Sequence, residues 1–424
     1  MSVIKLSDCC RSISDGDHMP PPKSAEGIPF LTISNIDSNN HLTFENTMFV
    51  PKDYWDQVDE KRKAQPGDVL LSVTGSYGIP VYVDFDREFV FQRHIAILKP
   101  DNNVILGKYL YYLLKNPSTK KIIDKLVTGA IQKTLGLDTI RNMSFDIPSI
   151  EEQQHALSIL SQIDDLIDNN NVICADLESM AKLLYDYWFV QFDFPDENGK
   201  PYKSSGGKMV WNDELKREIP EGWEVKSFEN CIESINTGLN PRNNFKLNTG
   251  GNIRYLTVKN LTTDGTIDFS SCDMIDEEAR EIVHRRSDIE VGDILFASIS
   301  PLGRCHVITD KPETWDINES VFSIRPNYRN MTSLFLYMTF MSEAFIKKAE
   351  GSSAGSVFKG IRIAELQRLI TVIPPKKVLD AFDQHVKSLF EMKATAFEEN
   401  QQLASLRDFL LPMLMNGQVK VKEA

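Results

Sequence analysis

The feature that most constrains this chain is an internal repeat, because motifs of its first half return in its second half at a nearly fixed spacing. Four segments of the first half resemble four of the second, at offsets of 225, 225, 226 and 226 residues: 28–36 with 253–261, 66–72 with 291–297, 92–100 with 318–326, and 147–149 with 373–375. A drift of one residue across four anchors is hard to obtain by chance. The sequence therefore predicts a tandem duplication of one structural unit.

Each predicted unit begins with a block that reads as β-rich. The anchors are short runs of Val, Ile, Leu, Phe and Tyr bounded by Gly, Pro, Asn or Asp, which is the pattern of strands. Between the anchors, residues 106–114 and 333–341 read as short helices. The sequence therefore predicts an α+β fold with one compact globular domain in each unit.

Each unit ends in a block that reads as one long helix. Apolar residues of the first block recur in steps of three and four, with Asn170 in the one polar slot: Ala156, Ile159, Ile163, Leu166, Ile173, Leu177, Met180, Leu184 and Tyr187. The second block repeats the pattern from Phe382 to Met413. A helix that merely covers its own domain is the simpler interpretation, but ~40 residues extend roughly 60 Å. We therefore expect the two helices to pair with each other as an antiparallel coiled coil.

The repeat and the helices together predict the domain organisation. Residues 195–222 are turn-rich and aperiodic, so they read as a linker that is long enough to turn the chain back. The expected order is a globular domain, a helical spacer, the linker, a second globular domain and a second helical spacer: 1–149, 150–194, 195–222, 223–375 and 376–417. Two such units joined through antiparallel helices would have a pseudo-twofold arrangement.

The charge distribution leaves a nucleic-acid partner open despite a net charge of −13. Residues 150–194 hold one lysine and nine Asp or Glu, whereas residues 1–149 hold 17 Lys or Arg and 18 Asp or Glu. Much of the acid excess thus lies on the first helix, and the globular blocks keep local basic clusters.

Composition predicts a cytoplasmic protein without a metal. The chain has no run of 18 apolar residues and no secretory signal at its N-terminus, so we expect neither a membrane span nor export. The six cysteines have no CxxC and no disulfide-like spacing, which is typical of free thiols in a reducing compartment. Cys305 and His306 are adjacent, but no second ligand pair stands nearby, so no metal site is expected.

Possible catalytic motifs lack the context that their chemistry requires. The chain has no phosphate-binding glycine loop, no GxGxxG and no Asn-Pro-Pro-Phe or Asp-Pro-Pro-Tyr motif of amino-methyltransferases. Gly351–Gly355 matches the G-x-S-x-G pattern with Ser353 as nucleophile, yet it follows a helix-like run instead of a strand. Asp196 stands in a stretch that faintly resembles a nuclease motif but lies in the polar linker. A hydrolase or nuclease is the alternative from the enzyme class, and a coiled-coil scaffold is the alternative without DNA.

Three segments near the end of the first predicted helix carry a family resemblance. Residues 177–190 read LESMAKLLYDYWFV, and they are followed by FDFP at 192–195 and IPEGWEV at 219–225. These segments resemble the central region of specificity subunits of type I restriction–modification enzymes. The Gly-Asp-(Val/Ile)-Leu and Ile-Pro motifs of both halves are similar to the target-recognition domains of that family. The resemblance covers nearly the whole chain.

The resemblance implies that the chain reads DNA sequence and catalyses nothing itself. Each target-recognition domain would read one half of a split site in double-stranded DNA, while the helices set the gap and dock methyltransferase subunits. Two methyltransferase subunits would bind, and restriction subunits would join through them. Adenine methylation, ATP-driven translocation and cleavage would belong to these partners, so no cofactor and no membrane are expected for this chain.

Candidate DNA-binding residues stand in loops at matching places in both units, where their side chains suit base edges or phosphate oxygens. They are Ser76, Tyr77, Gln92, Arg93, Gln132 and Lys133 in the first unit, and Lys259, Ser300, Arg304, Asn318, Ser356 and Lys359 in the second. Where the family often has Asn-Gln before the strand that ends in (Lys/Arg)-Pro, this chain has Gln92-Arg93 and Asn318-Glu319. If that pair contacts DNA, the two domains should read different half-sites.

Overall fold

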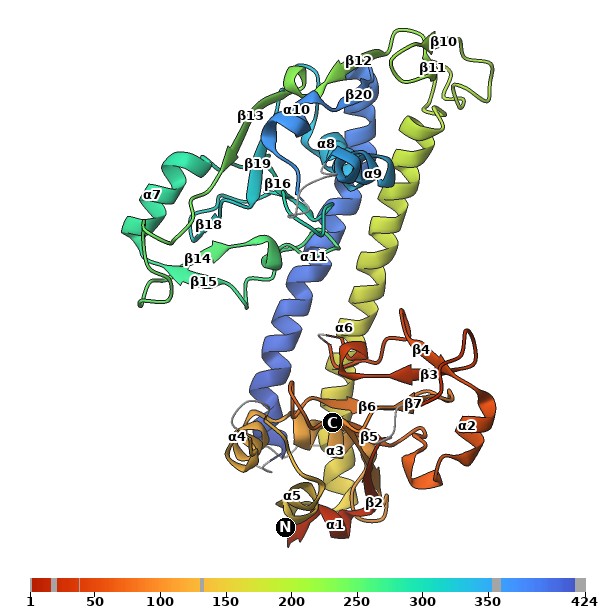
Figure 1. The fold of residues 1–424 in the computed structure, drawn as a ribbon, viewed down its shortest axis with the longest axis vertical. Helices are drawn as coiled ribbons and strands as arrows, with labels where there is room; N and C mark the ends of the chain where they lie inside the picture. The colour runs from red at the N-terminus through yellow and green to blue at the C-terminus, as the bar shows by residue number, and fades with distance from the viewer. Residues whose placement is uncertain (1, 17–20, 38, 130–132, 353–359, 416–424) are drawn as a thin grey trace. The chain divides into compact units, whose positions relative to one another are not determined.

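The structure is a computed structural model of the 424-residue chain, and it describes residues 2–16, 21–37, 39–129, 133–352 and 360–415. The chain divides into two compact units (Figure 1). Unit 1 comprises residues 1–170 with 398–424, and unit 2 comprises residues 171–397. Both long helices cross this division, so each of them contributes one part to each unit.

Unit 1 is built around a four-stranded antiparallel sheet with the order β2-β8-β5-β6. Its strands are β2 (Cys10–Asp15), β8 (Ile95–Pro100), β5 (Val69–Ser72) and β6 (Pro80–Tyr82). A three-stranded sheet, in which β3 and β7 are parallel, consists of β4 (Met48–Val50), β3 (Ile28–Leu31) and β7 (Val90–Phe91). A two-stranded ladder joins β1 (Ser2–Lys5) to β9 (Ser144–Ile147).

Unit 2 repeats these three sheets in the same strand order. Its four-stranded sheet is β13 (Ile232–Thr237), β19 (Val321–Pro326), β16 (Ile294–Ala297) and β17 (Cys305–Val307). Its three-stranded sheet is β15 (Asp273–Ile275), β14 (Ile253–Leu256) and β18 (Trp315–Ile317). Its two-stranded ladder is β12 (Glu224–Ser227) with β20 (Ile370–Ile373). The predicted duplication and the α+β class are confirmed strand by strand.

Each four-stranded sheet has two inner strands, and the one that we call the central strand, β5 or β16, is buried on both faces. In β5, Val69 and Leu71 belong to one hydrophobic cluster and Leu70 to another. In β16, Phe296 and Leu295 are divided between two clusters in the same way. Burial on both faces explains why these strands read as continuous apolar runs without alternation.

One helix in each unit covers the four-stranded sheet. Helix α3 (Gly107–Lys115) packs against β5 and β6, and α8 (Ser333–Met341) packs against β16 and β17. The short helices predicted at 106–114 and 333–341 are thus confirmed within one residue. The remaining short helices are α1 (Leu6–Cys9), α2 (Lys52–Gln57), α4 (Pro117–Leu126), α5 (Leu137–Asn142), α7 (Glu277–Ser287), α9 (Glu343–Ser352) and α10 (Ile363–Arg368).

The first repeated anchor, read from the sequence as a strand, is a strand only in its first half. In unit 1 the strand ends at Leu31 and a 3₁₀ turn, η1, spans Ile33–Asn35. The backbone amide of Thr32 donates to Asn35 Oδ1 at 2.9 Å, and this side-chain cap bends the chain out of the sheet. In unit 2 the amide of Thr257 donates to Asn260 Oδ1 at 2.8 Å. The strand interpretation was wrong there because β-branched residues hid a capping motif.

The two long helices are α6 (Ile150–Tyr185) and α11 (Lys376–Met415). In unit 1, Asp164 Oδ1 lies 2.9 Å from Arg407 Nη1, and Asn170 Nδ2 donates to Glu399 Oε2 at 3.1 Å. Residue numbers rise on one helix as they fall on the other, so the two helices are antiparallel in this unit. Although burial acts to raise the pKa of the Asp164 carboxyl, the neighbouring Lys115, Tyr112 and Arg407 together hold it below its ordinary value.

In unit 2 the same helices pair by aromatic and ionic contacts. Glu178 Oε2 lies 2.9 Å from Lys393 Nζ. Further along, the ring of Trp188 lies 5.7 Å from that of Phe382. Trp188 belongs to a turn of π-helix, Asp186–Val190, that follows α6 directly. The predicted antiparallel pairing of two long helices is therefore observed in each unit (Figure 1).

The face that forms the helix seam differs from the predicted one. Of the predicted seam, Leu166, Ile173, Met180 and Tyr187 are exposed. Ala156, Ile163 and Leu177 of the predicted seam are buried, and together with further positions on a neighbouring face they form a stripe with steps of three, four and seven: Ala156, Leu160, Ile163, Asn170, Leu177, Ala181, Tyr185 and Trp188. The helix thus carries two adjacent apolar stripes, and periodicity alone does not say which one its partner covers. Asn170 does occupy the seam, as expected.

The segment 195–222, expected to be a linker, is ordered against unit 2. It contains an antiparallel hairpin of β10 (Met209–Asn212) and β11 (Arg217–Pro220). The ring of Phe194 stacks on Tyr202 at 4.7 Å and lies 5.0 Å from Trp223. Its aperiodic sequence therefore reflects a small, aromatic-anchored hairpin.

Candidate nucleic-acid interface

Three loops of unit 1 converge at the end of strand β5. The amide of Val73 donates to the carbonyl oxygen of His94, and the amide of Leu135 donates to the carbonyl oxygen of Val73, at 2.8 Å each. The amide of Gly75 donates to the carbonyl oxygen of Lys133 at 3.1 Å. These bonds bring together candidate residues from three separate parts of the sequence, namely Ser76, Tyr77, Gln92, Arg93 and Lys133.

Unit 2 repeats this convergence at the end of β16. The amide of Ser298 donates to the carbonyl oxygen of Ser320 at 3.0 Å, and the amide of Ile361 donates to that of Ser298 at 2.8 Å. The loop that carries Ser300 and Arg304 therefore lies beside the turn between β18 and β19. Two of the backbone bonds that hold the candidate loops thus recur at matching positions in both units.

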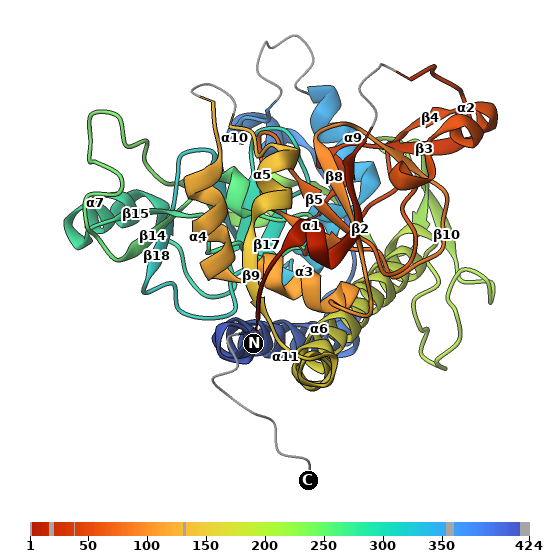
Figure 2. The same cartoon turned by 90° about the horizontal axis from the view of Figure 1, so that it is seen from below.

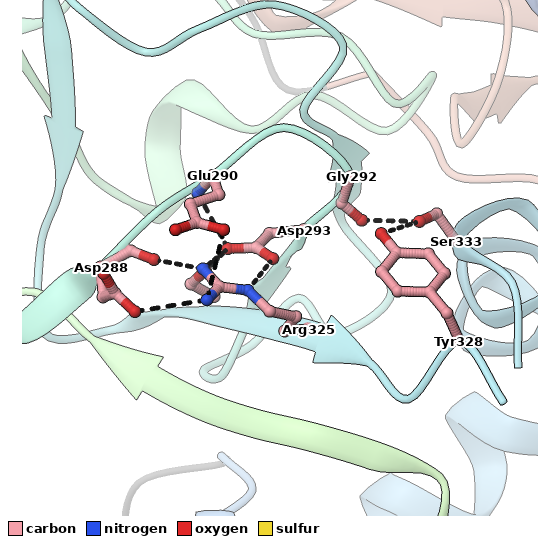
Figure 3. A network of polar contacts seen from close by, with 8 residues as sticks. Asp288, Glu290, Gly292, Asp293, Arg325, Tyr328 and Ser333 are labelled. Atoms are coloured by element: carbon pink, nitrogen blue, oxygen red, sulfur yellow. Dashed lines mark hydrogen bonds and ion pairs between the residues drawn. The ribbon is translucent and has the colours of Figure 1, made fainter. Parts of the chain in front are cut away.

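A buried carboxylate fixes the start of the central strand in unit 2. Asp293 is 1% exposed, and its two oxygens accept from Arg325 Nε at 2.8 Å and Arg325 Nη2 at 2.9 Å (Figure 3). Asp293 Oδ2 also accepts from Ser323 Oγ at 3.0 Å and from the amide of Glu290 at 2.9 Å. Hydrogen bonding to Asp293 is the main reason that the pKa of Arg325 is raised. These four hydrogen bonds to Asp293 therefore fix the positions of Arg325, Ser323 and the backbone at Glu290 relative to one another.

Unit 1 uses a lysine for the same purpose. Asp68 Oδ2 accepts from Lys99 Nζ at 2.7 Å, and both residues are buried. The glycine before each aspartate, Gly67 or Gly292, has a φ of 96° or 94°, a left-handed conformation that favours glycine. The Gly-Asp and (Lys/Arg)-Pro motifs are thus two ends of one ion pair. Each pair ties the central strand to the strand that follows the candidate turn, so it positions that turn from within the core.

The candidate side chains of unit 1 differ in how freely they reach solvent. Ser76, Arg93 and Lys133 are exposed, whereas Tyr77 and Gln92 are half-buried. Lys120 of α4 places its ammonium 4.1 Å from the centre of the Tyr77 ring and pairs with Asp124. In the sequence, Lys120 stands next to Lys121 in one of the local basic clusters. Only the fold places it beside Tyr77.

In unit 2, Lys259 and Ser300 are exposed, and Arg304 is half-buried with its Nη1 donating to the carbonyl oxygen of Val258 at 3.4 Å. Asn318 Oδ1 accepts from the amide of Ser320 at 3.0 Å, so this oxygen helps to shape the turn. The next residue in the turn, Glu319, receives a hydrogen bond from Asn240 and was not among the sequence candidates. The candidates Gln132, Ser356 and Lys359 lie outside the described residues.

The possible catalytic groups are those that the sequence offered, Asp196 and Ser353, together with the cysteine thiols. Asp196 Oδ1 accepts from the amides of Asn198 and Lys200 at 2.8 Å each, so it closes a turn in the hairpin segment. Ser353 lies outside the described residues. Burial raises the pKa of the Cys9 and Cys231 thiols to about 11, which keeps them protonated at neutral pH.

The described residues show neither a metal-binding cluster nor a helix suited to a membrane. Among the residues that the structure describes, no group of three His, Cys, Asp or Glu side chains is arranged to hold a metal ion. In the same residues, no helix combines the length and apolarity needed to cross a membrane.

Comparison with known proteins gives matches in both halves of the chain. A family model described as the type I restriction modification DNA specificity domain matches residues 2–179 and 220–404. The chain is 28% identical to the type I restriction enzyme MjaIX specificity subunit of Methanocaldococcus jannaschii over 75% of this chain and 70% of that protein. It is 24% identical to the HindI specificity subunit of Haemophilus influenzae over 85% and 88%.

A solved structure has a related fold. The type I restriction–modification S subunit of M. genitalium aligns with a TM-score of 0.53 at 15% identity, covering 97% of this chain and 95% of that one. At this identity the likeness concerns the fold alone. It agrees with the duplicated sheets and paired helices described above.

Proposed function

The chain belongs to the type I restriction–modification DNA specificity family, and from this premise we propose that it is the non-catalytic subunit that reads the DNA target of such an enzyme. Each unit would contact one half of a bipartite site in double-stranded DNA through the loops at the end of β5 or β16. The observation that carries the proposal is the repeated convergence of these loops, held by equivalent backbone bonds in both units. A scaffold alone would not require such a match.

The side chains that the two interfaces present are different, and this supports two different half-sites. At matching positions of the turn, unit 1 has Arg93 and unit 2 has Glu319. Arg93 is exposed and offers a guanidinium, which donates to guanine or to phosphate. A carboxylate offers only acceptors and repels phosphate. One backbone frame with different donors and acceptors is suited to an asymmetric target.

The helices offer a surface for methyltransferase subunits. Within unit 2, five apolar side chains on one face of the first long helix and its π-turn are 37–66% exposed: Ile173, Met180, Leu183, Tyr187 and Val190. A contiguous exposed apolar stripe is typical of a protein interface. We assign it to a methyltransferase subunit, and two such subunits with restriction subunits attached through them would complete a cytoplasmic enzyme.

Domain grafting tests the proposed function directly. Residues 1–149 are replaced by the first domain of another specificity subunit, the enzyme is assembled with its methyltransferase subunits, and methylated adenines are mapped in DNA. Because unit 1 and unit 2 have separate cores, we expect one half of the site to change and the other half to remain. The matched control replaces residues 223–375 and should alter only the other half.

Two results would contradict this proposal. If both half-sites change together in either graft, the domains do not read DNA independently. If the assembled wild-type enzyme methylates no defined sequence, the chain does not confer specificity.

A further inference from the structure

The connection between β13 and β14, residues 238–252, stands out in an acidic chain. It contains five asparagines, Arg242 and Lys246, and it has no Asp or Glu, although the whole chain has a net charge of −13. It does not resemble the matching connection of the first unit. Residues 16–27 instead contain three prolines and Lys23, with Asp17 and Glu26.

This loop is anchored on its inner side by apolar contacts. The ring of Phe245 packs edge-on against Tyr255 at 5.5 Å between centroids. Leu239 and Leu247 pack against the same hydrophobic cluster. Asn248 joins the loop to β15, because its Oδ1 accepts from the amide of Met274 at 2.8 Å. The apolar side chains therefore pack against the domain and anchor the loop.

The loop begins next to the candidate interface of unit 2. The amide of Gly238 donates to the carbonyl oxygen of Asn318 at 3.1 Å. The approach is so close that a Cβ at Gly238 would lie 1.7 Å from the carbonyl oxygen of Ile317. Asn240 Nδ2 then donates to Glu319 Oε1. Two successive contacts thus fix the loop to the turn between β18 and β19.

The polar side chains of the loop divide into two groups. Asn240, Asn244 and Asn248 make hydrogen bonds inside the domain, so they hold the loop in shape. Arg242 and Lys246 are exposed, and within the described residues neither forms an ion pair. The loop is therefore a pre-ordered support for two cations with no acidic neighbour in the same segment.

We infer that loop 238–252 is a further DNA-contacting element of the second recognition domain, in which Arg242 and Lys246 bind backbone phosphates beside the half-site. This inference rests on the proposed function. Two exposed cations among amides match phosphate chemistry, because Arg, Lys and Asn are frequent phosphate donors. Leu239, Phe245 and Leu247 are partly buried against the domain, so the exposed cations are the main feature that the loop presents to a partner. The matching segment of the first domain has a different sequence, so the proposed contact is specific to the second domain.

The test compares salt dependence in the assembled complex with methyltransferase subunits. The probe is a duplex that carries the site found by mapping methylated adenines, and its affinity is measured by fluorescence anisotropy from 50 to 200 mM salt. The test variant is Arg242→Ala with Lys246→Ala. The matched control is Arg329→Ala with Lys311→Ala, which also removes one exposed arginine and one exposed lysine of unit 2. These control residues lie beyond the ends of β19 and β18 that are distant from the turn.

The expected result is a smaller salt slope for the test variant only. Each phosphate contact contributes about 0.9 to the slope of log K against log salt, so losing two lowers it by about 1.8 and weakens binding by up to about 60-fold at 0.1 M salt. The mapped sequence should remain unchanged. Asn240→Asp, which places two carboxylates together and releases the loop, should give the same loss while both cations are still present.

The outcomes separate this inference from the proposed function. If the wild-type complex prefers its mapped site and the test variant keeps the wild-type slope, the loop does not contact phosphate and the inference is overturned. If the control variant loses as much slope as the test variant, the effect is a general charge effect and the inference also fails. If the wild-type complex does not discriminate its mapped site, the proposed function itself is wrong.

Discussion

Removal of the buried carboxylate of Asp293 should destabilise unit 2 strongly. In the Asp293→Ala variant, Arg325 loses both of its short charge-assisted hydrogen bonds, and its side chain is only 16% exposed. Ser323 Oγ and the amide of Glu290 also lose their acceptor. The carboxylates of Asp288 and Glu290, which Figure 3 also draws beside Arg325, then remain as its partners, and their side chains are 57% and 63% exposed.

The expected magnitude follows from the burial of the pair. Removing one partner of a buried ion pair costs about 3–5 kcal/mol, and the lower end applies here because Arg325 keeps its more exposed contacts with Asp288 and Glu290. Glu290 provides the matched control, since its carboxylate contacts the same arginine at 3.4 Å but its side chain is 63% exposed. An alanine at Asp288 would be strained, because that residue has a φ of 44°. An exposed pair contributes about 0–1 kcal/mol, so Glu290→Ala should have little effect.

Hydrogen exchange at the β16 and β19 amides is the appropriate measurement, because a chain of two units need not unfold in one step. A loss of about 3–5 kcal/mol lowers protection by about 2–4 orders of magnitude where exchange requires opening of this sheet. The single variant Arg325→Lys should retain more protection than Asp293→Ala, because Lys99 makes the equivalent ion pair in unit 1. If Asp293→Ala loses no more protection than Glu290→Ala, the carboxylate does not hold the central strand, and the reasoning is refuted.

Three further predictions concern the helices and the turn. Leu177→Ala should lower the free energy of unfolding in urea by about 2–4 kcal/mol, because Leu177 is buried in the seam at 7% exposure. Met180 is 54% exposed, so Met180→Ala should change stability by less than about 0.5 kcal/mol and instead weaken capture of the methyltransferase subunit. Equal stability losses in the two variants would show that the seam is assigned wrongly. Because the pKa of Asp164 is lowered in the folded state, its ionised form stabilises unit 1 above about pH 4, and this contribution is lost as pH falls through the folded pKa. The free energy of unfolding of Asp164→Asn should therefore depend less on pH between about pH 5 and 2, and an unchanged pH profile would contradict this prediction. Gly238→Ala should displace the turn at Ile317 and weaken DNA binding by the assembled enzyme, and a variant with wild-type affinity would show that the close approach is not needed.

The repeat shows how far sequence alone can go. Matching segments at offsets of 225 and 226 predicted two copies of one fold, and the copies share the order of all three sheets. This succeeds because strand order depends on the whole pattern of apolar runs and turns, which duplication carries over intact. The loops that form the candidate interface could be predicted for the same reason, since they connect matched strands.

The state of individual side chains in those loops could not be predicted. Asn318 is a suitable base reader by residue type, yet its oxygen is used by the turn. Tyr77 lies under the ammonium of Lys120, which is 43 positions away in the sequence. A side chain is free or occupied according to which neighbours the fold brings to it. For that reason loop 238–252, which has no counterpart motif, was also missed.

The sequence by itself determined that α6 and α11 would be long, amphipathic and antiparallel, because apolar periodicity, helix length and the repeat are all local properties of the chain. Only the tertiary structure decided which stripe of α6 lies in the seam. Met180 and Leu177 are equally apolar and belong to one heptad pattern, but one is exposed and the other is buried. Two adjacent stripes have similar hydrophobic driving forces. The choice between them therefore depends on the shapes and hydrogen bonds of the facing helix and domain, as in the contact of Asn170 with Glu399.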